Sequence, residues 1–151
     1  MKRKSLVKIH VAATIVAAQT IVAFFTTSVI AEIKADPGFI REVKFFILCA
    51  MPIMIIAMPA LNITGTKLAG KSQNKIILVK KKRMKLMMLN GIGLMSLAIF
   101  LFYRSHYGNI DGVFLGAQIV EFILGLTNLT LIGLNARSGF ELSGRLKRVK
   151  K

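Results

Sequence analysis

Four long apolar stretches constrain the fold of this chain more than any other feature. They run from Ile9 to Ala31, Phe45 to Ile63, Leu86 to Tyr103 and Val113 to Leu134, and only the last contains a charged residue, Glu121. A helix needs about 20 residues to cross a hydrocarbon core of ~30 Å. Each stretch is therefore long enough to span a membrane, and the sequence predicts an integral membrane protein.

The composition and the short connections indicate a single transmembrane domain over residues 1–151. Hydrophobic residues make up 54% of the chain and charged residues 19%. Only helices or closed barrels can cross lipid, and the apolar stretches lack the alternating pattern of barrel strands. We therefore expect an all-α four-helix bundle made of two antiparallel hairpins. A basic loop over 64–85 joins the hairpins, and a basic tail over 135–151 follows them.

The basic residues predict the orientation. Eighteen of the 22 Lys and Arg residues lie before the first stretch, between the second and third, or after the fourth. Under the positive-inside rule both termini are cytoplasmic. The same rule explains the net charge of +16, so we expect no nucleic-acid partner. A cleaved signal is the alternative for the first stretch, but signal cores are about 7–15 residues long, which favours four retained spans.

Turn-forming residues mark the two outer connections. Asp36, Pro37 and Gly38 predict a turn between the first two helices, in which Gly38 is able to adopt a left-handed backbone. Between the third and fourth helices, either Asn109 or Asp111 is expected to cap the helix that follows.

The fourth stretch carries the strongest candidate for a functional site. Gln118, Glu121, Gly125 and Asn128 recur at helical spacing and share one face, which Asn135 continues. We call the first four residues the polar stripe. A carboxyl near the middle of a span is costly in lipid and is expected to point into the bundle. It either fastens helices through hydrogen bonds or carries a proton or an ion, and we favour fastening.

Depth in the membrane predicts the partners of the polar stripe. Small and polar residues are typical of close contacts between membrane helices. At the levels of the stripe, the first helix offers Gln19 and Thr26, and the third offers Asn90 and Ser96. These four are the predicted facing partners. If Glu121 only fastens helices to them, Glu121→Gln is expected to preserve stability, because Gln keeps the shape and the hydrogen-bonding capacity.

No catalytic, metal or cofactor site is predicted. The sequence lacks a phosphate-binding glycine loop, a nucleophile elbow and a zinc-binding His pair. The methionines of the second stretch are explained by packing rather than by copper. His10 and His106 lie almost a membrane thickness apart, too far to hold one haem in a monomer.

Two further patterns point to lipid and to helix pairing. The basic run Lys80, Lys81, Lys82 and Arg83 is expected to contact anionic lipid headgroups, unless it serves orientation alone. Gly112 and Gly116 form a small-xxx-small spacing, a weak signal for pairing with another helix.

Several segments together resemble a known kind of protein. Lys82-Arg83-Met84 before Leu89-Asn90-Gly91, then Asn109-Ile110-Asp111-Gly112 and the run from Leu126 to Asn135, are similar to small bacterial four-span inner-membrane proteins of uncharacterised function. The similarity mainly covers the second hairpin. It implies a multi-pass protein of the bacterial cytoplasmic (inner) membrane and implies nothing about activity.

The pattern as a whole favours a non-enzymatic integral membrane protein. We expect an accessory or assembly subunit, packed through its polar stripe within the chain or against another membrane subunit or a second copy. A small proton-coupled transporter that uses Glu121 is the alternative, and a haem- or quinone-linked redox anchor is the second alternative.

Overall fold

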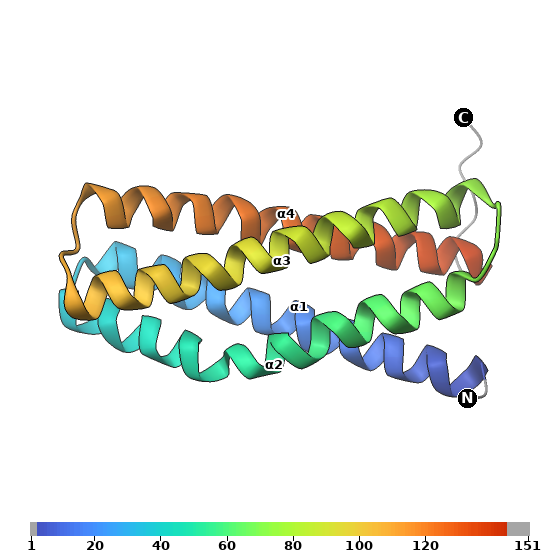
Figure 1. Cartoon of the computed structure of the whole chain (residues 1–151), viewed down its shortest axis with the longest axis horizontal. Helices are drawn as coiled ribbons and strands as arrows, with labels where there is room; N and C mark the ends of the chain where they lie inside the picture. The colour runs from blue at the N-terminus through green and yellow to red at the C-terminus, as the bar shows by residue number, and fades with distance from the viewer. Residues whose placement is uncertain (1–2, 145–151) are drawn as a thin grey trace.

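The computed structural model describes residues 3–144, and this part of the chain is all-α. Its four helices are α1 (Arg3–Lys34), α2 (Pro37–Ala69), α3 (Lys75–Tyr107) and α4 (Gly112–Leu142). Each helix is long and apolar enough to cross a membrane. They lie side by side in one elongated bundle (Figure 1), which confirms the predicted all-α four-helix bundle and gives it four candidate membrane-spanning helices.

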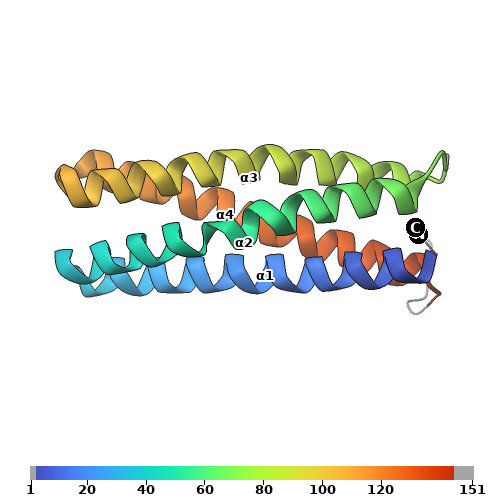
Figure 2. The same ribbon diagram turned by 60° about the horizontal axis from the view of Figure 1, so that its bottom comes forward.

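The helices pack in chain order around the bundle. α1 contacts α2, α2 contacts α3, and α3 contacts α4, while the contact between α1 and α4 closes the ring more sparsely. α1 and α2 form one hairpin and α3 and α4 the other, as the short outer connections predict. Figures 1 and 2 show that the first turns of α1 and the last turns of α4 lie at the same end as the α2–α3 connection. We call this the basic end.

The helices extend well beyond the apolar stretches at the basic end. The expected loop over 64–85 is mostly helix, because α2 continues to Ala69 and α3 begins at Lys75. Lys, Arg, Met and Leu are good helix formers, and Asn74 caps α3 by accepting a hydrogen bond from the Ile76 N–H at 2.9 Å. α4 likewise continues to Leu142 through the first half of the expected tail. The rest of that tail, residues 145–151, lies outside the described residues, as do residues 1–2.

The capping residues define the two outer turns. Asp36 caps α2 by accepting the Gly38 N–H at 3.0 Å, and Pro37 is the first residue of that helix. Ala35, with φ 50°, takes the left-handed conformation, so the prediction for Gly38 was wrong. Pro37 suits a first helical turn, and the chain must therefore complete its reversal before it. At the second turn Asp111 caps α4, confirming one of the two predicted caps.

Two apolar clusters fill the interior, and the outside of the bundle is also apolar. One cluster lies toward the basic end and includes Met58, Met87 and Leu131, whereas the other lies toward the opposite end and includes Ile47 and Phe114. Large hydrophobic side chains are exposed on every helix. This is the surface expected of a bundle whose solvent is lipid rather than water. The polar stripe passes between these clusters.

Candidate functional site

The polar stripe of α4 faces the interior of the bundle. Gln118 and Asn128 are fully buried, and Gly125 is buried between them. The Glu121 side chain is 13% exposed. The helical spacing therefore identified the inward face of α4 correctly, and Asn135, which is also buried, continues that face toward the basic end.

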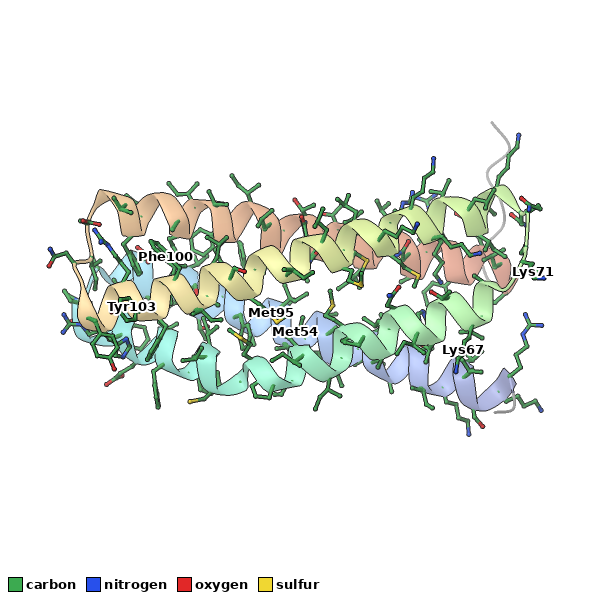
Figure 3. All side chains as sticks on the ribbon, in the orientation of Figure 1. Met54, Lys67, Lys71, Met95, Phe100 and Tyr103 are labelled. Atoms are coloured by element: carbon green, nitrogen blue, oxygen red, sulfur yellow. The ribbon has the colours of Figure 1, made fainter. Side chains whose placement is uncertain are left out.

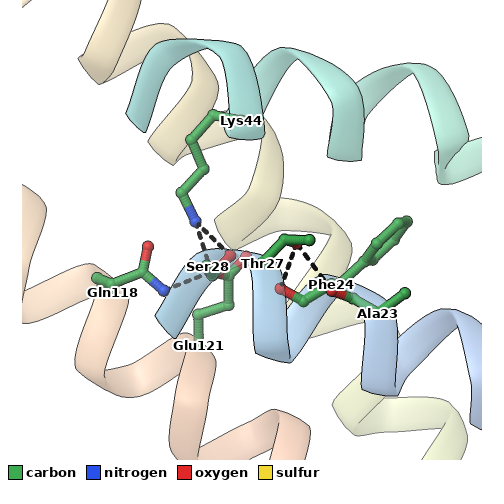
Figure 4. Close-up of polar contacts among 7 residues, drawn as sticks. All are labelled: Ala23, Phe24, Thr27, Ser28, Lys44, Gln118 and Glu121. Atoms are coloured by element: carbon green, nitrogen blue, oxygen red, sulfur yellow. Dashed lines mark hydrogen bonds and ion pairs between the residues drawn. The ribbon is translucent and has the colours of Figure 1, made fainter. Parts of the chain in front are cut away.

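Glu121 forms an ion pair with Lys44 inside the bundle. The Lys44 Nζ lies 2.8 Å from the Glu121 Oε2 and also donates a hydrogen bond to the Ser28 Oγ at 3.3 Å. The Gln118 Nε2 donates to the same Glu121 oxygen at 2.7 Å. Figure 4 shows these groups converging from α1, α2 and α4. We call the four residues Ser28, Lys44, Gln118 and Glu121 the ion-pair site.

Each part of the ion-pair site is held by its helix. Lys44 lies about two turns into α2, whose start is fixed by the Asp36 cap and by Pro37. Gln118 and Glu121 are three residues apart on α4 and therefore neighbours on its surface. Lys44 is one of the largest fully buried side chains, with an exposed fraction of 1%. A buried ammonium requires a charged partner and further acceptors, and α4 and α1 supply them.

Unpaired hydrogen-bond acceptors lie in and near the ion-pair site. The Gln118 Oε1 is buried and has no hydrogen-bond partner among the described residues, and the same holds for the Glu32 Oε1 on α1. Glu32 is half-buried, and the charges of both Lys44 and Glu121 act on it. Glu32 is therefore a second acidic group within electrostatic range of Lys44.

Farther along the stripe the amides are poorly paired. Neither the Nδ2 nor the Oδ1 of Asn128 has a hydrogen-bond partner in the described part of the chain. The Asn135 Nδ2 donates a weak bond to the Met87 Sδ at 3.5 Å, whereas its Oδ1 is unpaired within residues 3–144. Buried amides normally find partners, so these groups are available to another polar group or to water.

The predicted facing partners were mostly wrong. Gln19, Thr26 and Ser96 are exposed on the outside of the bundle, and the Thr26 and Ser96 hydroxyls donate to carbonyls of their own helices. Asn90 is half-buried, but its Nδ2 makes no hydrogen bond to any described residue. Depth alone does not fix rotation about the helix axis. α1 is apolar on all sides, so its sequence does not mark which face turns inward.

Sequence reasoning missed Lys44 and Ser28. Lys44 was counted with the outer connection, because the apolar stretch that follows begins at Phe45. A Lys at the boundary of a span usually extends its side chain to the membrane surface, whereas this one turns inward. The sequence signal that could have identified Lys44 was Glu121 itself. A carboxyl inside a span is expected to pair with a cation at a similar depth in the membrane.

A cavity of about 70 Å³ lies in the middle of the bundle beside Glu121. All four helices line it, almost wholly with apolar atoms, and its sulfur-containing residues include Met54 and Met95, which face it from α2 and α3 (Figure 3). Empty apolar cavities of this kind stay dry. The cavity therefore suits an apolar group better than a chain of waters.

The remaining candidate ligands are scattered. His10 shares a hydrogen bond with the Thr64 hydroxyl at 2.9 Å, near the basic end, while His106 lies at the far end of α3. Within residues 3–144 there is no group of three or more His, Cys, Asp or Glu side chains able to hold a metal ion.

In the predicted lipid-contact run, Lys81 donates to the Gly70 carbonyl, and Arg83 donates to the Leu134 carbonyl and the Ser138 hydroxyl. Lys80 is half-buried, and Lys82 is exposed.

Comparisons with known proteins give no family assignment. No family model, curated protein or solved structure matches this chain. The fold and the ion-pair site define it as a four-helix bundle with four candidate membrane-spanning helices and a buried Lys–Glu pair.

Proposed function

We propose that this protein is a non-enzymatic integral membrane protein that acts as an accessory or assembly subunit. The observation that carries the proposal is that the Glu121 carboxylate is already bound within the bundle. Its Oε2 accepts hydrogen bonds from Lys44 on α2 and from Gln118 on α4. Because Lys44 also binds Ser28, one network ties three helices together. The neighbouring cavity is lined almost wholly by apolar atoms, which does not favour a path of water to Glu121. These features support fastening.

The outer face of α4 supports a role as a subunit. Gly112 and Gly116 are exposed one helical turn apart, and a Cβ added at either glycine would meet no described atom within 4 Å. Small residues at this spacing allow the backbone of another membrane helix to approach closely. We propose that a helix of a partner subunit, or of a second copy, packs there.

Purification of the tagged protein from native membranes in a mild detergent tests this role. We expect a stoichiometric partner that Gly116→Leu removes and Gly133→Leu retains. Gly133 is the matched control, since it is also exposed on α4 with open space around it. A protein that stays alone, or a partner that both variants lose equally, would contradict the proposal.

We further propose a location in the bacterial cytoplasmic (inner) membrane with both termini in the cytoplasm. The gathering of basic residues at one end of the bundle supports this orientation. Reporter tags joined at Lys2 and Lys151 should report cytoplasm, and a tag near Gly38 should report the opposite side. Exposure of either terminal tag on the outer side would overturn the orientation.

Proton-coupled transport is the second candidate. The buried polar atoms that have no hydrogen-bond partner near the ion pair favour it, because they are able to bind a transported ion or proton carrier. The unpaired oxygens of Gln118 and Glu32 lie in the region of the ion pair. About two helical turns farther along α4, the side-chain amide of Asn128 also has no hydrogen-bond partner within the described chain. A double variant, Lys44→Met with Glu121→Gln, keeps the shape of the ion-pair site but carries no titratable group there. A stable double variant that loses a pH-gradient-dependent flux would support transport and contradict simple fastening. An unchanged flux in the double variant would support the role of the ion pair in fastening the helices.

A further inference from the structure

A groove between α3 and α4 at the basic end combines charged and apolar walls. Its volume is about 340 Å³. α3 contributes one face of its first three turns, and α4 contributes one face of its last three. The residues that line the groove are Lys75, Ile76, Val79, Arg83, Leu134, Arg137, Ser138 and Glu141.

The groove carries an excess of positive charge. Three of its lining residues are cationic and one is anionic, which gives a net charge of +2. The Arg137 Nε lies 3.3 Å from the Glu141 Oε1, so one cation is partly compensated. Lys75 is exposed and has no ion-pair partner in the described part of the chain. Charge complementarity therefore calls for an anion.

Arg83 is held in place at the inner end of the groove. Its Nη1 donates to the Leu134 carbonyl and to the Ser138 hydroxyl, each at 3.3 Å, which leaves other guanidinium N–H groups free to donate. A planar guanidinium anchored in this way suits a phosphate, whose oxygens accept paired hydrogen bonds. Ser138 is buried behind it at 9% exposure.

The position of the groove points to a lipid. Leu134 ends the fourth apolar stretch, and Arg83 lies just before the third, so the inner end of the groove is level with the edge of the hydrocarbon core. Val79 and Leu134 are partly exposed apolar walls. A free anion has no use for such walls, whereas a phospholipid presents both a phosphate and apolar chains at this depth. Basic pockets between helices at the cytoplasmic face commonly bind anionic headgroups.

We propose that this groove binds one anionic phospholipid, with its phosphodiester between Lys75, Arg83 and Arg137 beside Val79, and its glycerol and upper acyl chains against Leu134 at the inner end. The assignment moves the lipid contact from the run Lys80–Arg83 to a site that two helices build together. Of that run, Arg83 belongs to the groove.

A titration of the purified full chain in non-ionic detergent tests the site. Phosphatidylglycerol should raise the melting temperature in a saturable manner, and phosphatidylcholine with the same acyl chains should bind much more weakly. Each Lys or Arg near an anionic surface strengthens binding about fivefold. The double variant Lys75→Gln/Arg137→Gln should therefore raise the apparent Kd for phosphatidylglycerol by about 25-fold at low salt.

The matched control is Lys67→Gln/Lys71→Gln, which removes the same charge from exposed positions outside the groove (Figure 3). It should leave the affinity within about twofold of the wild type. Glu141→Gln supplies an independent readout, because removal of the groove's carboxylate should tighten binding about fivefold. That gain would not follow from a purely structural role.

Three results would overturn the proposal. Equal losses in the groove pair and the control pair would mean a diffuse attraction to the whole basic surface. Equal affinity for phosphatidylcholine would remove the role of charge. Stabilisation by inorganic phosphate as strong as that by phosphatidylglycerol would identify a site for a free anion instead of a lipid. If the groove pair fails to fold, an unchanged affinity in Glu141→Gln would be sufficient to reject the site.

Discussion

Removing one partner of the Lys44–Glu121 ion pair should cost far more than removing both. The two charged atoms lie 2.8 Å apart with side-chain exposures of 1% and 13%. At an effective dielectric constant of ~20, the attraction at this distance is about 6 kcal/mol. The cost of taking both charges out of solvent offsets most of it, so the intact pair contributes little compared with an apolar pair of the same shape.

The single variants should differ from each other for a structural reason. Glu121→Gln leaves the Lys44 ammonium almost fully buried without its counter-charge, with neutral oxygens such as the Ser28 hydroxyl and the new amide as its acceptors, and we expect a loss of about 3–5 kcal/mol. Lys44→Met leaves Glu121 with its Gln118 donor and with a side chain that is less buried than that of Lys44. We expect a smaller loss of about 1–3 kcal/mol. This ranking reverses the sequence-based expectation that Gln would replace Glu121 without loss.

The double variant Lys44→Met/Glu121→Gln should return to within about 1 kcal/mol of the wild type, because no uncompensated charge remains. The measurement is reversible unfolding in mixed detergent micelles, followed by circular dichroism, for all four proteins. Together these values imply a coupling free energy of about 3 kcal/mol or more between the two positions. Strictly additive losses, or a Glu121→Gln variant as stable as the wild type, would refute the ion pair.

Three further perturbations test other parts of the structure. Ala17 is fully buried and Gln19 exposed, so Ala17→Phe should destabilise the bundle by about 1–3 kcal/mol while Gln19→Leu changes stability by less than about 0.5 kcal/mol in the same assay; equal effects would contradict the inward face of α1. Gly116→Ala should stabilise by about 0.5–1 kcal/mol, whereas Gly65→Ala should stabilise less, because its new Cβ requires the end of the Met84 side chain to move; thermal unfolding of the two variants compares them directly, and an equal gain would contradict the Gly65–Met84 contact. The Phe114 N–H and the Arg104 guanidinium hold the pKa of Asp111 below its usual value, so Asp111 stabilises the fold above pH ~4 and loses this effect as the pH falls through the lowered pKa; the stability difference from Asp111→Ala should shrink on acidification, and a constant difference would argue against the cap.

The fold was largely predictable because lipid imposes few solutions. Four apolar stretches of sufficient length, separated by polar connections, permit a helical bundle and little else. The polar stripe was predictable for a related reason, since α4 carries its polar residues at a clear helical period. The inward positions of Gln118, Gly125 and Asn128 follow from that period alone.

The partners of the stripe were not predictable by the same reasoning. Counting residues gives the depth of Gln19 or Ser96 in the membrane but not the direction in which its side chain points. The helix ends at the basic end were missed for a different reason. The apolar stretches mark the spans and not the ends of the helices, because Lys and Arg continue a helix readily beyond an apolar stretch.

The ion-pair site supplies the information that the apolar residues lack. Between helices in lipid, apolar faces gain little from contact with one another, so many rotations of α1 would be similar in free energy. Ser28 and Lys44 select one of these rotations. The buried Lys44 ammonium needs hydrogen-bond acceptors, and it reaches Ser28 and Glu121 only when α1 and α4 are each turned so that these side chains face it. Ala17 and Ala31, both buried on the same helix as Ser28, then allow close packing in that rotation. A single charge at the start of the second span thus selects the arrangement of three helices, and the apolar residues fill the space that it defines.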